Sequence, residues 1–191
     1  GKPEEYCILA LLPAYLERTG SSLVYMVDDL IKKSTHPKSG FYLNNHQELR
    51  STLEKLKAQG QKTLLIGVSF GLLDFVEEQT FQWPELTVME TGGMKGRRKE
   101  MIRSELHFIL KQGFGVSNIH SEYGMTELLS QAYSNENGLY HCPPWMKVST
   151  RDSADPFSTT KFGQSGGLNI IDLANINSCA FIATDDLAKV Y

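Results

Sequence analysis

The sequence predicts an α/β fold, with a largely parallel sheet flanked by helices and followed by a β-rich portion. Over the first 135 residues, strand-like and helix-like segments alternate, which is typical of a parallel sheet covered by helices. Beyond them, short apolar runs are separated by turn-rich connections. The chain has 191 residues, which suits one domain of ordinary size or two small ones, and 41% of them are hydrophobic, enough for a real core. We therefore expect one α/β unit at 1–191, with an α/β body at 1–135 and a β-rich portion of the same domain at 136–191.

The expected strands of the body are short apolar runs, and TLLIGV at 63–68 is the clearest of them. These strands are expected at 6–12, 41–43, 63–68, 86–89 and 118–121. The expected helices have apolar stripes, caps or glycine stops, and they span 22–31, 46–59, 72–79, 97–112 and 126–134. In the β-rich portion, strands are expected within 139–150, 168–173 and 180–184, with a long loop at 149–167.

The composition excludes several classes of protein. Lys and Arg number 19 against 22 Asp and Glu, so no global basic field favours nucleic acid. No apolar run approaches the ~20 residues that a membrane-spanning helix needs, and no secretory leader opens the chain. The three cysteines, Cys7, Cys142 and Cys179, are too widely spaced for a CxxC pair or a four-cysteine zinc site. They fit a reducing compartment, so a cytoplasmic location is expected.

The segment GVSFG at 67–71 has the GxSxG pattern between an expected strand and an expected helix. In that context the pattern is typical of a nucleophile elbow, with Ser69 as nucleophile. Glu90 and His120, each near the end of an expected strand, could serve as acid and base. The alternative is that the two glycines flank an ordinary turn and Ser69 lines a pocket. His107, in an expected helix, is interpreted as a surface residue.

The segment TGGMKGRR at 91–98 joins an expected strand to the longest expected helix. Its glycines, Gly92 and Gly93 among them, let the backbone approach a ligand, and a helix N-terminus after them would favour an anion. The spacing fits neither a dinucleotide fingerprint nor a Walker loop. The basic run Lys95–Lys99 is either a rim for an anionic ligand or acidic partner, or a solvated face.

Two further segments follow expected strands. In YGMTE at 123–127, Tyr123 can stack on a planar base, Thr126 can donate to a phosphate oxygen and Glu127 can hold Mg²⁺. The alternative is a helix N-terminus capped by Thr126. In TDDL at 184–187, Asp186 could accept hydrogen bonds from a ribose diol. The alternatives are that the two adjacent aspartates bind a metal or are turn residues.

The ordered set TGG, YGMTE and TDDL resembles the acyl-adenylate-forming superfamily, which includes acyl-CoA synthetases, luciferase-like enzymes and adenylation domains. More narrowly, the chain resembles the LuxE-like acyl-protein synthetases over nearly its whole length. The segments that carry this closer resemblance are 12–18, 21–24, 69–74, 90–97, 120–127, 166–168 and 172–175.

The resemblance implies the activation of a carboxylic acid, for example a fatty acid, by ATP to acyl-AMP, followed by transfer to a thiol on a protein or CoA. It implies ATP or AMP and Mg²⁺ as cofactors, and an acidic carrier or a reductase complex as a partner. The implied roles are an adenine pocket for Thr91, Gly92 and Gly93, adenine packing for Tyr123 beside Gly124, α-phosphate contact for Thr126, Mg²⁺ for Glu127 and ribose for Asp186. Thr126 and Glu127 are also the implied catalytic residues, and Ser69 would lie near the acyl pocket.

The chain departs from the superfamily pattern at several places. Asp185 stands where the superfamily has a glycine, and no phosphate loop precedes the other motifs, although Ser158–Lys161 has some of its residue types. The C-terminal domain with its catalytic lysine, and the acyl-accepting cysteine of LuxE-like enzymes, are not found. The resemblance therefore implies an internal fragment that supplies an adenylate-binding wall, with weak nucleotide binding and poor turnover. The non-enzymatic alternative is a protein or acyl-carrier docking module that uses Lys95–Lys99.

Overall fold

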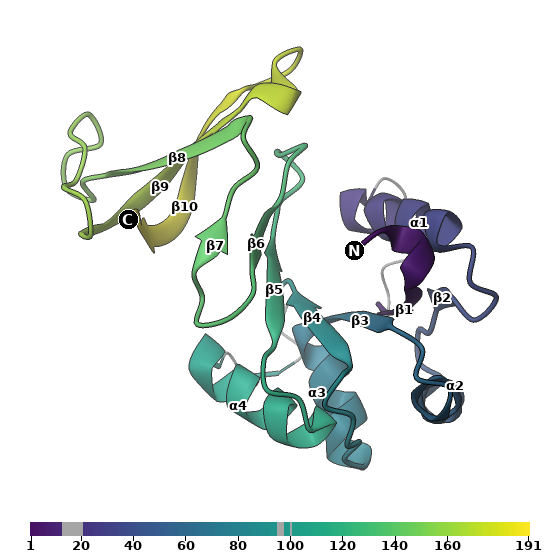
Figure 1. Cartoon of the computed structure of the whole chain (residues 1–191). Coiled ribbons are helices and arrows are strands. Elements are labelled where there is room, and N and C mark those ends of the chain that lie inside the picture. Colours follow the sequence, from purple (N-terminus) through teal and green to yellow (C-terminus); the bar gives the residue numbers. More distant parts are fainter. Residues whose placement is uncertain (13–20, 95–97, 100) are drawn as a thin grey trace. The chain divides into compact units, whose positions relative to one another are not determined.

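The computed structural model describes residues 1–12, 21–94, 98–99 and 101–191 (Figure 1). Residues 13–18, which carry part of the family resemblance, therefore lie outside the described residues. Two compact units make up the described chain. The first contains Gly1–Tyr123 and Ser134–Leu139, and the second contains Gly124–Tyr133 and Tyr140–Tyr191. The division into a body at 1–135 and a β-rich portion at 136–191 stays a prediction.

The first unit is built on a parallel sheet with the strand order β2-β1-β3-β4-β5. Its strands are β1 (Cys7–Leu11), β2 (Gly40–Phe41), β3 (Thr63–Val68), β4 (Thr87–Thr91) and β5 (His120–Tyr123). In the register, Leu65 faces Leu9 on one side and Val88 on the other. Parallel strands covered on both faces need continuous apolar runs, and β1 is buried along its whole length. The predicted parallel sheet is confirmed.

The helices of the first unit are the 3₁₀ turn η1 (Pro3–Glu5) and the α-helices α1 (Ser22–Ser34), α2 (His46–Ala58), α3 (Ser69–Glu78) and α4 (Arg103–Phe114). Two of them, α1 and α2, begin directly after residues whose side chains cap them. The backbone N–H of Val24 donates to Oγ of Ser21 at 3.4 Å, which caps α1. Asn45 and Glu48 form the reciprocal cap predicted for α2, with the Glu48 N–H donating to Asn45 Oδ1 at 3.1 Å.

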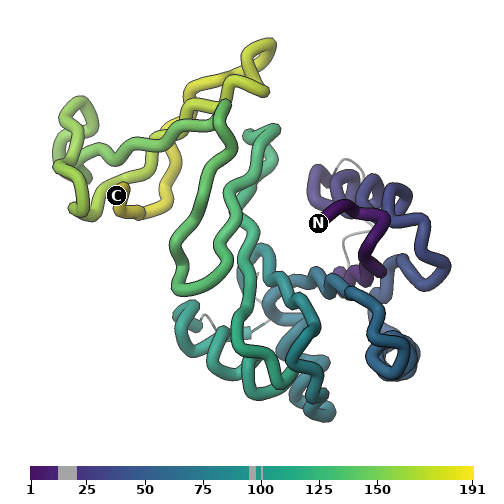
Figure 2. Tube along the Cα trace, in the orientation of Figure 1, coloured from purple at the N-terminus to yellow at the C-terminus, as the bar shows by residue number. Residues whose placement is uncertain are grey.

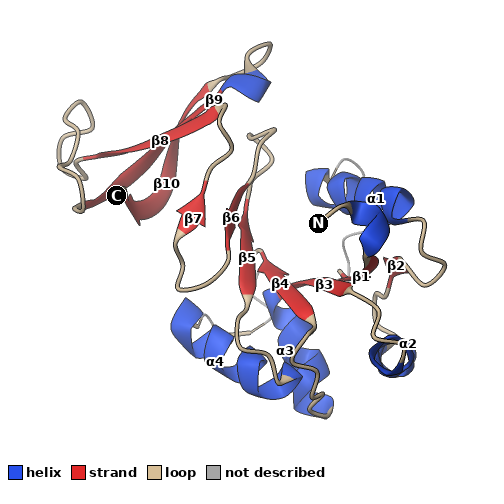
Figure 3. Ribbon diagram, in the orientation of Figure 1, coloured by secondary structure: helices blue, strands red, loops and turns tan. Residues whose placement is uncertain are grey.

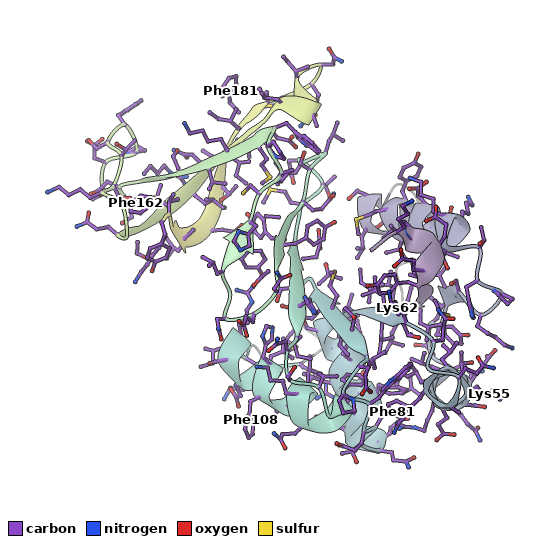
Figure 4. All side chains as sticks on the ribbon, viewed as in Figure 1. Lys55, Lys62, Phe81, Phe108, Phe162 and Phe181 are labelled. Atoms are coloured by element: carbon purple, nitrogen blue, oxygen red, sulfur yellow. The ribbon has the colours of Figure 1, made fainter. Side chains whose placement is uncertain are left out.

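Helices α3 and α4 lie side by side, as the blue ribbons of Figure 3 show. Phe75 on α3 stacks on Phe114 of α4, with ring centroids 5.8 Å apart. Gly113 permits this close approach, because a Cβ there would lie 2.5 Å from Cβ of Val76. These side chains belong to the apolar core of the unit, to which the labelled Phe81 in Figure 4 also belongs.

Two predicted helices are wrong in extent or type. The helix expected at 97–112 begins only at Arg103, so the described residues Arg98 and Lys99 precede it in a turn. The segment expected to be helical at 126–134 instead forms turns and then β6 (Ala132–Ser134). Burial along this segment alternates with period two, with the buried positions at Leu128, Ser130, Ala132 and Ser134. The buried serines, Ser130 and Ser134, follow this period of two and not the period of a helix.

The second unit contains an antiparallel sheet with the order β10-β9-β8. The strands of this sheet are β8 (Met146–Arg151), β9 (Ser165–Asp172) and β10 (Phe181–Lys189). The unit also contains β7 (Tyr140–His141) and the 3₁₀ turn η2 (Leu173–Asn175). The light green and yellow part of the tube in Figure 2 follows the last three strands and the loop at 152–164. The guanidinium of Arg151 on β8 donates to backbone oxygens of Leu168 on β9 and Thr184 on β10. The predicted β-rich portion is confirmed.

The surface of the second unit carries exposed aromatic side chains, among them Phe157, Phe162 and Phe181, the last two labelled in Figure 4. Within the ranges that the structure describes, no helix is long and apolar enough to cross a membrane.

Candidate functional site

The carboxyl ends of β4 and β5 lie at one edge of the parallel sheet and bring two of the predicted motifs together. Thr91, the last residue of β4, is paired in register with Glu122 of β5, and Tyr123 follows as the last residue of β5. Ligands of open α/β sheets bind outside the carboxyl ends of the strands. The structure thus has the TGG segment and the first residue of YGMTE on neighbouring strand ends.

The backbone of the TGG segment is open to solvent. Gly92 has φ +68°, in the left-handed region that favours glycine. A Cβ added to Gly93 would meet nothing within 4 Å among the described atoms. Both glycines are exposed, whereas Thr91 is buried. This open space beside an exposed backbone fits the approach of a planar ligand, as the sequence predicts for adenine.

Thr91 also fixes the neighbouring strand end, because its hydroxyl donates to the carboxylate of Glu122. Burial raises the pKa of Glu122, the negative charge of Glu90 raises it further, and the hydrogen bond from Thr91 opposes both effects. Glu122 therefore keeps its proton to a higher pH than an exposed glutamate.

Ser69 and Glu90 form a buried polar network behind the TGG segment. The Ser69 hydroxyl donates to the carbonyl oxygen of Gly92 at 2.9 Å and to Oε2 of Glu90 at 3.1 Å. On its other side, Oε1 of Glu90 lies 3.4 Å from Nε2 of His107 and 3.6 Å from Nε of Arg103. Burial alone would raise the pKa of Glu90, but hydrogen bonds with His107 and Ser121 and the charge of Arg103 outweigh it and lower the pKa.

This geometry does not suit a serine nucleophile. In a catalytic triad the histidine stands between the serine and the acid, so that it can take the serine proton. Here the carboxylate of Glu90 stands between Ser69 and His107, and the described partners of the Ser69 hydroxyl are acceptors. The side chain of Ser69 is also buried. The alternative of an ordinary turn at the strand end fits the structure better than the hydrolase interpretation, and a pocket lined by Ser69 stays a prediction.

The remaining residues of YGMTE belong to the second unit. Gly124, Thr126 and Glu127 are exposed, and the next residue, Leu128, is buried. No helix follows Thr126, so its interpretation as a helix cap is wrong. The polar side chains of Thr126 and Glu127 are thus exposed, while the next residue, Leu128, is buried in the unit.

Asp186 also belongs to the second unit but does not follow a strand end. It lies within β10, where the pairing with β9 is irregular between Ala183 and Leu187. Its backbone N–H donates to Oγ1 of Thr184 at 3.2 Å, and that hydroxyl donates to the carbonyl oxygen of Leu168 at 3.1 Å. Asp185 and Asp186 are exposed in this irregular stretch. The expected strand end at residue 184 is wrong, because pairing resumes at Leu187.

The basic run before α4 is partly neutralised. Arg98 donates through Nε to Oδ1 of Asp74 at 2.9 Å and through Nη1 to Oε1 of Glu77 at 2.7 Å. Lys99 is exposed, and Lys95, Gly96 and Arg97 lie outside the described residues. Because α4 begins at Arg103, the expected anion site at a helix start directly after the glycines is wrong. The guanidinium of Arg98 therefore pairs with carboxylates of α3 and does not form part of a free basic rim.

Glu127 fits the Mg²⁺ role in a limited sense. In the part of the chain that the structure describes, no group of three or more His, Cys, Asp or Glu side chains could hold a metal ion. Mg²⁺ commonly takes one or two carboxylates together with substrate phosphates and waters, and needs no cage made entirely by the protein. An exposed carboxylate one residue from an exposed hydroxyl suits that mode of binding.

The sequence missed two features of this region. His107 was expected at the surface, yet it is buried against Glu90, one residue from the inward Leu106 on α4. That position beside the apolar stripe could have indicated burial. The contacts of Asp172 and Asn175 with the segment after Glu127 were not foreseen, because they join residues more than 40 positions apart.

Comparison with known proteins was made at the level of sequence and of structure. No protein-family model and no curated protein sequence matches the chain. Solved structures do match over nearly all of it. An O-succinylbenzoate coenzyme A synthetase from Bacillus subtilis, in complex with ATP and magnesium ion, matches with TM-score 0.60 and 14% identity over 97% of this chain and 39% of that one.

Two further structures match in the same way. A long-chain-fatty-acid-CoA ligase from Archaeoglobus fulgidus has TM-score 0.63 and 12% identity, covering 99% of this chain and 42% of that one. Apo MatB from Rhodopseudomonas palustris has TM-score 0.59 and 14% identity, covering 98% and 38%. The chain spans about two-fifths of the length of these structures. Its fold is similar to that of part of these structures.

Proposed function

We propose that the chain is the adenylate-binding part of an enzyme that activates a carboxylic acid with ATP, forming acyl-AMP and pyrophosphate. The observation that carries this proposal is the fold, which is similar to acid–CoA ligases over nearly the whole chain. The fold similarity coincides with the motif order, since TGG begins at the end of β4 and YGMTE begins at the end of β5. The fold similarity and the motif order together support the activity better than either does alone.

In this proposal each residue of the motifs has the role that the family resemblance implies. The open backbone of Gly92 and Gly93 receives the adenine, and Tyr123 packs against the ring. Thr126 donates to the α-phosphate, Glu127 holds Mg²⁺, and Asp186 accepts from the ribose hydroxyls. The metal would supply charge neutralisation for the phosphates. Positioning and charge neutralisation are the main requirements, because a carboxylate and a phosphate must be brought together.

The finer part of the proposal concerns substrate and acceptor. The resemblance to LuxE-like acyl-protein synthetases supports a fatty acid as the acid, and a thiol on a protein or CoA as the acceptor. One matched structure is a long-chain-fatty-acid-CoA ligase, which is compatible with a fatty acyl substrate here. The proposed partners are an acidic carrier or a reductase complex, and the proposed location is the cytoplasm.

The test is a calorimetric titration of the chain with ATP, with and without Mg²⁺, for the wild type and Glu127→Gln. We expect Mg²⁺ to strengthen ATP binding to the wild type and to have little effect on the variant, since the variant lacks the carboxylate that would hold the ion. AMP binding without metal should be unchanged. The matched control is Glu85→Gln, which removes an exposed carboxylate of the first unit. An equal Mg²⁺ effect in Glu127→Gln and the wild type would contradict the assignment of Glu127.

A further inference from the structure

The segment that follows Glu127 has no helix or described strand up to β6, so its backbone needs other hydrogen-bond partners. One side chain, that of Asp172, accepts hydrogen bonds from two of the backbone N–H groups. The backbone N–H groups of Leu129 and Ser130 donate to Oδ2 of Asp172, at 3.0 Å and 2.9 Å. The Ser130 hydroxyl donates to Oδ1 of the same carboxylate at 2.7 Å. Asp172 is the last residue of β9 and is fully buried.

A second side chain binds the backbone of Glu127 itself. Nδ2 of Asn175 donates to the Glu127 carbonyl oxygen at 2.7 Å and to the Cys179 carbonyl oxygen at 2.9 Å. Asn175 ends η2, which begins directly after Asp172, and Oδ1 of Asp172 accepts from the Ala174 N–H at 3.1 Å. The same turn that presents Asp172 therefore presents Asn175. Together the two side chains fix the backbone at residues 127, 129 and 130.

The carboxylate of Asp172 is kept charged inside the unit. Burial by itself would raise its pKa, but the hydrogen bonds from the Ser130 hydroxyl and from the amides of Ser130, Leu129 and Ala174 outweigh burial and lower it. A buried carboxylate with donors on both oxygens accepts only a narrow range of geometries. The segment after Glu127 is therefore held in one conformation, while the side chains of Thr126 and Glu127 remain exposed.

We propose that Asp172 and Asn175 are positioning residues for the Thr126–Glu127 pair. This inference rests on the proposed function. The two buried side chains, here called the η2 clamp, fix the backbone that carries the phosphate and Mg²⁺ contacts and so reduce the cost of ordering it when the nucleotide binds. Asn175 acts on Glu127 through one hydrogen bond, and Asp172 acts on the next turn of chain.

The experiment compares Asn175→Ala and Asp172→Asn with the wild type in titrations with ATP, with and without Mg²⁺, and with AMP. The control is Thr150→Val, which removes a buried hydroxyl of β8 that pairs with the Thr160 hydroxyl in the following loop, away from the clamp. Asn175→Ala removes the amide that donates to the Glu127 and Cys179 carbonyl oxygens and leaves Asp172 in place, so it tests the inference even if Asp172→Asn does not fold.

We expect Asn175→Ala to reduce the strengthening of ATP binding by Mg²⁺ about tenfold, the order of effect for one lost hydrogen bond. Metal-free AMP binding should change less than about twofold, and Thr150→Val should keep the wild-type response to Mg²⁺. A wild-type response to Mg²⁺ in both clamp variants would overturn the inference and leave the proposed function standing. A wild-type chain that binds neither ATP nor AMP would overturn the proposed function, and the inference with it.

Discussion

Replacing Asp172 by Asn should destabilise the second unit although the two side chains have nearly the same shape. Four donors converge on the carboxylate: the N–H groups of Leu129, Ser130 and Ala174, and the Ser130 hydroxyl. An asparagine has one acceptor oxygen, and its NH₂ group would face the donors that Oδ1 or Oδ2 now accepts. With the NH₂ group in place of Oδ2, the N–H groups of Leu129 and Ser130 lose their acceptor. With it in place of Oδ1, the Ala174 N–H loses its acceptor and the Ser130 hydroxyl must accept instead of donating.

The expected loss follows from the charge-assisted character of these bonds. Each hydrogen bond to a charged group contributes about 1.5–3 kcal/mol, and the relief of burying a charge offsets part of the sum. We expect a net decrease of roughly 3 kcal/mol in the free energy of unfolding near pH 7, a large share of the ~5–15 kcal/mol typical of a domain. Asp155→Asn, in an exposed turn with donors from Phe157 and Ser158, should leave the unfolding midpoint unchanged.

The assay is urea unfolding followed by the fluorescence of Trp145, in a Trp83→Phe background so that one tryptophan reports. Trp145 donates through Nε1 to the Ser130 hydroxyl at 2.9 Å and so probes the clamp directly. The pKa of Asp172 is lower in the folded state than in the unfolded chain. Its contribution is therefore present above the unfolded value of about 3.9 and is lost as the pH falls through the folded value.

The difference in stability between the wild type and Asp172→Asn should consequently narrow as the pH is lowered below about 4. An Asp172→Asn midpoint at pH 7 no lower than that of Asp155→Asn would refute the account of Asp172. A difference that stayed constant into acid would refute the assignment of a charged carboxylate.

Three further predictions concern the first unit. Gly113→Ala should lower the free energy of unfolding by about 1–3 kcal/mol, because its Cβ would clash with Val76. Adding Val76→Ala should recover part of this loss, since it removes two of the three close contacts. Denaturation curves in which the two substitutions are fully additive would contradict this prediction. A fluorophosphonate should not label the wild-type chain, since the Ser69 hydroxyl donates to two acceptors, and labelling that Ser69→Ala abolished would restore the hydrolase interpretation. Glu90→Gln should lower the free energy of unfolding near pH 7. The difference from the wild type should shrink below about pH 4.3, because the partners of Glu90 outweigh its burial and lower its pKa in the folded state. Thermal unfolding across pH measures this difference, and a difference that grew in acid would contradict the prediction.

The sequence predicted the parallel sheet because its evidence is local. Strands such as TLLIGV at 63–68 are apolar throughout, as the two covered faces of β3 require. The side chains of Ser21 and Asn45 cap α1 and α2, so residues at the helix starts predict where these helices begin. In each case the residues that determine the element lie within or beside it.

The sequence could not predict features that depend on distant partners. The segment at 126–134 was predicted to be a helix, but Asp172, which lies more than 40 residues later, accepts hydrogen bonds from the N–H groups of Leu129 and Ser130 in a non-helical segment. In the same way β10 continues past Asp186 because β9 resumes pairing at Leu187. Local propensity was overridden by tertiary hydrogen bonds in both places. The motifs TGG and YGMTE were found from the chain, and the residues that support them required the structure.

The central claim is an adenylate site, and it is tested most directly by calorimetric titration with a non-hydrolysable acyl-AMP mimic. The wild-type chain is compared with Asp186→Ala, which removes the carboxylate assigned to the ribose hydroxyls. We predict weak but saturable binding to the wild type, weakened by about 1–3 kcal/mol in the variant, the scale for hydrogen bonds to a charged group. No binding to the wild type up to millimolar concentrations, or equal affinity in the variant, would contradict the proposed site.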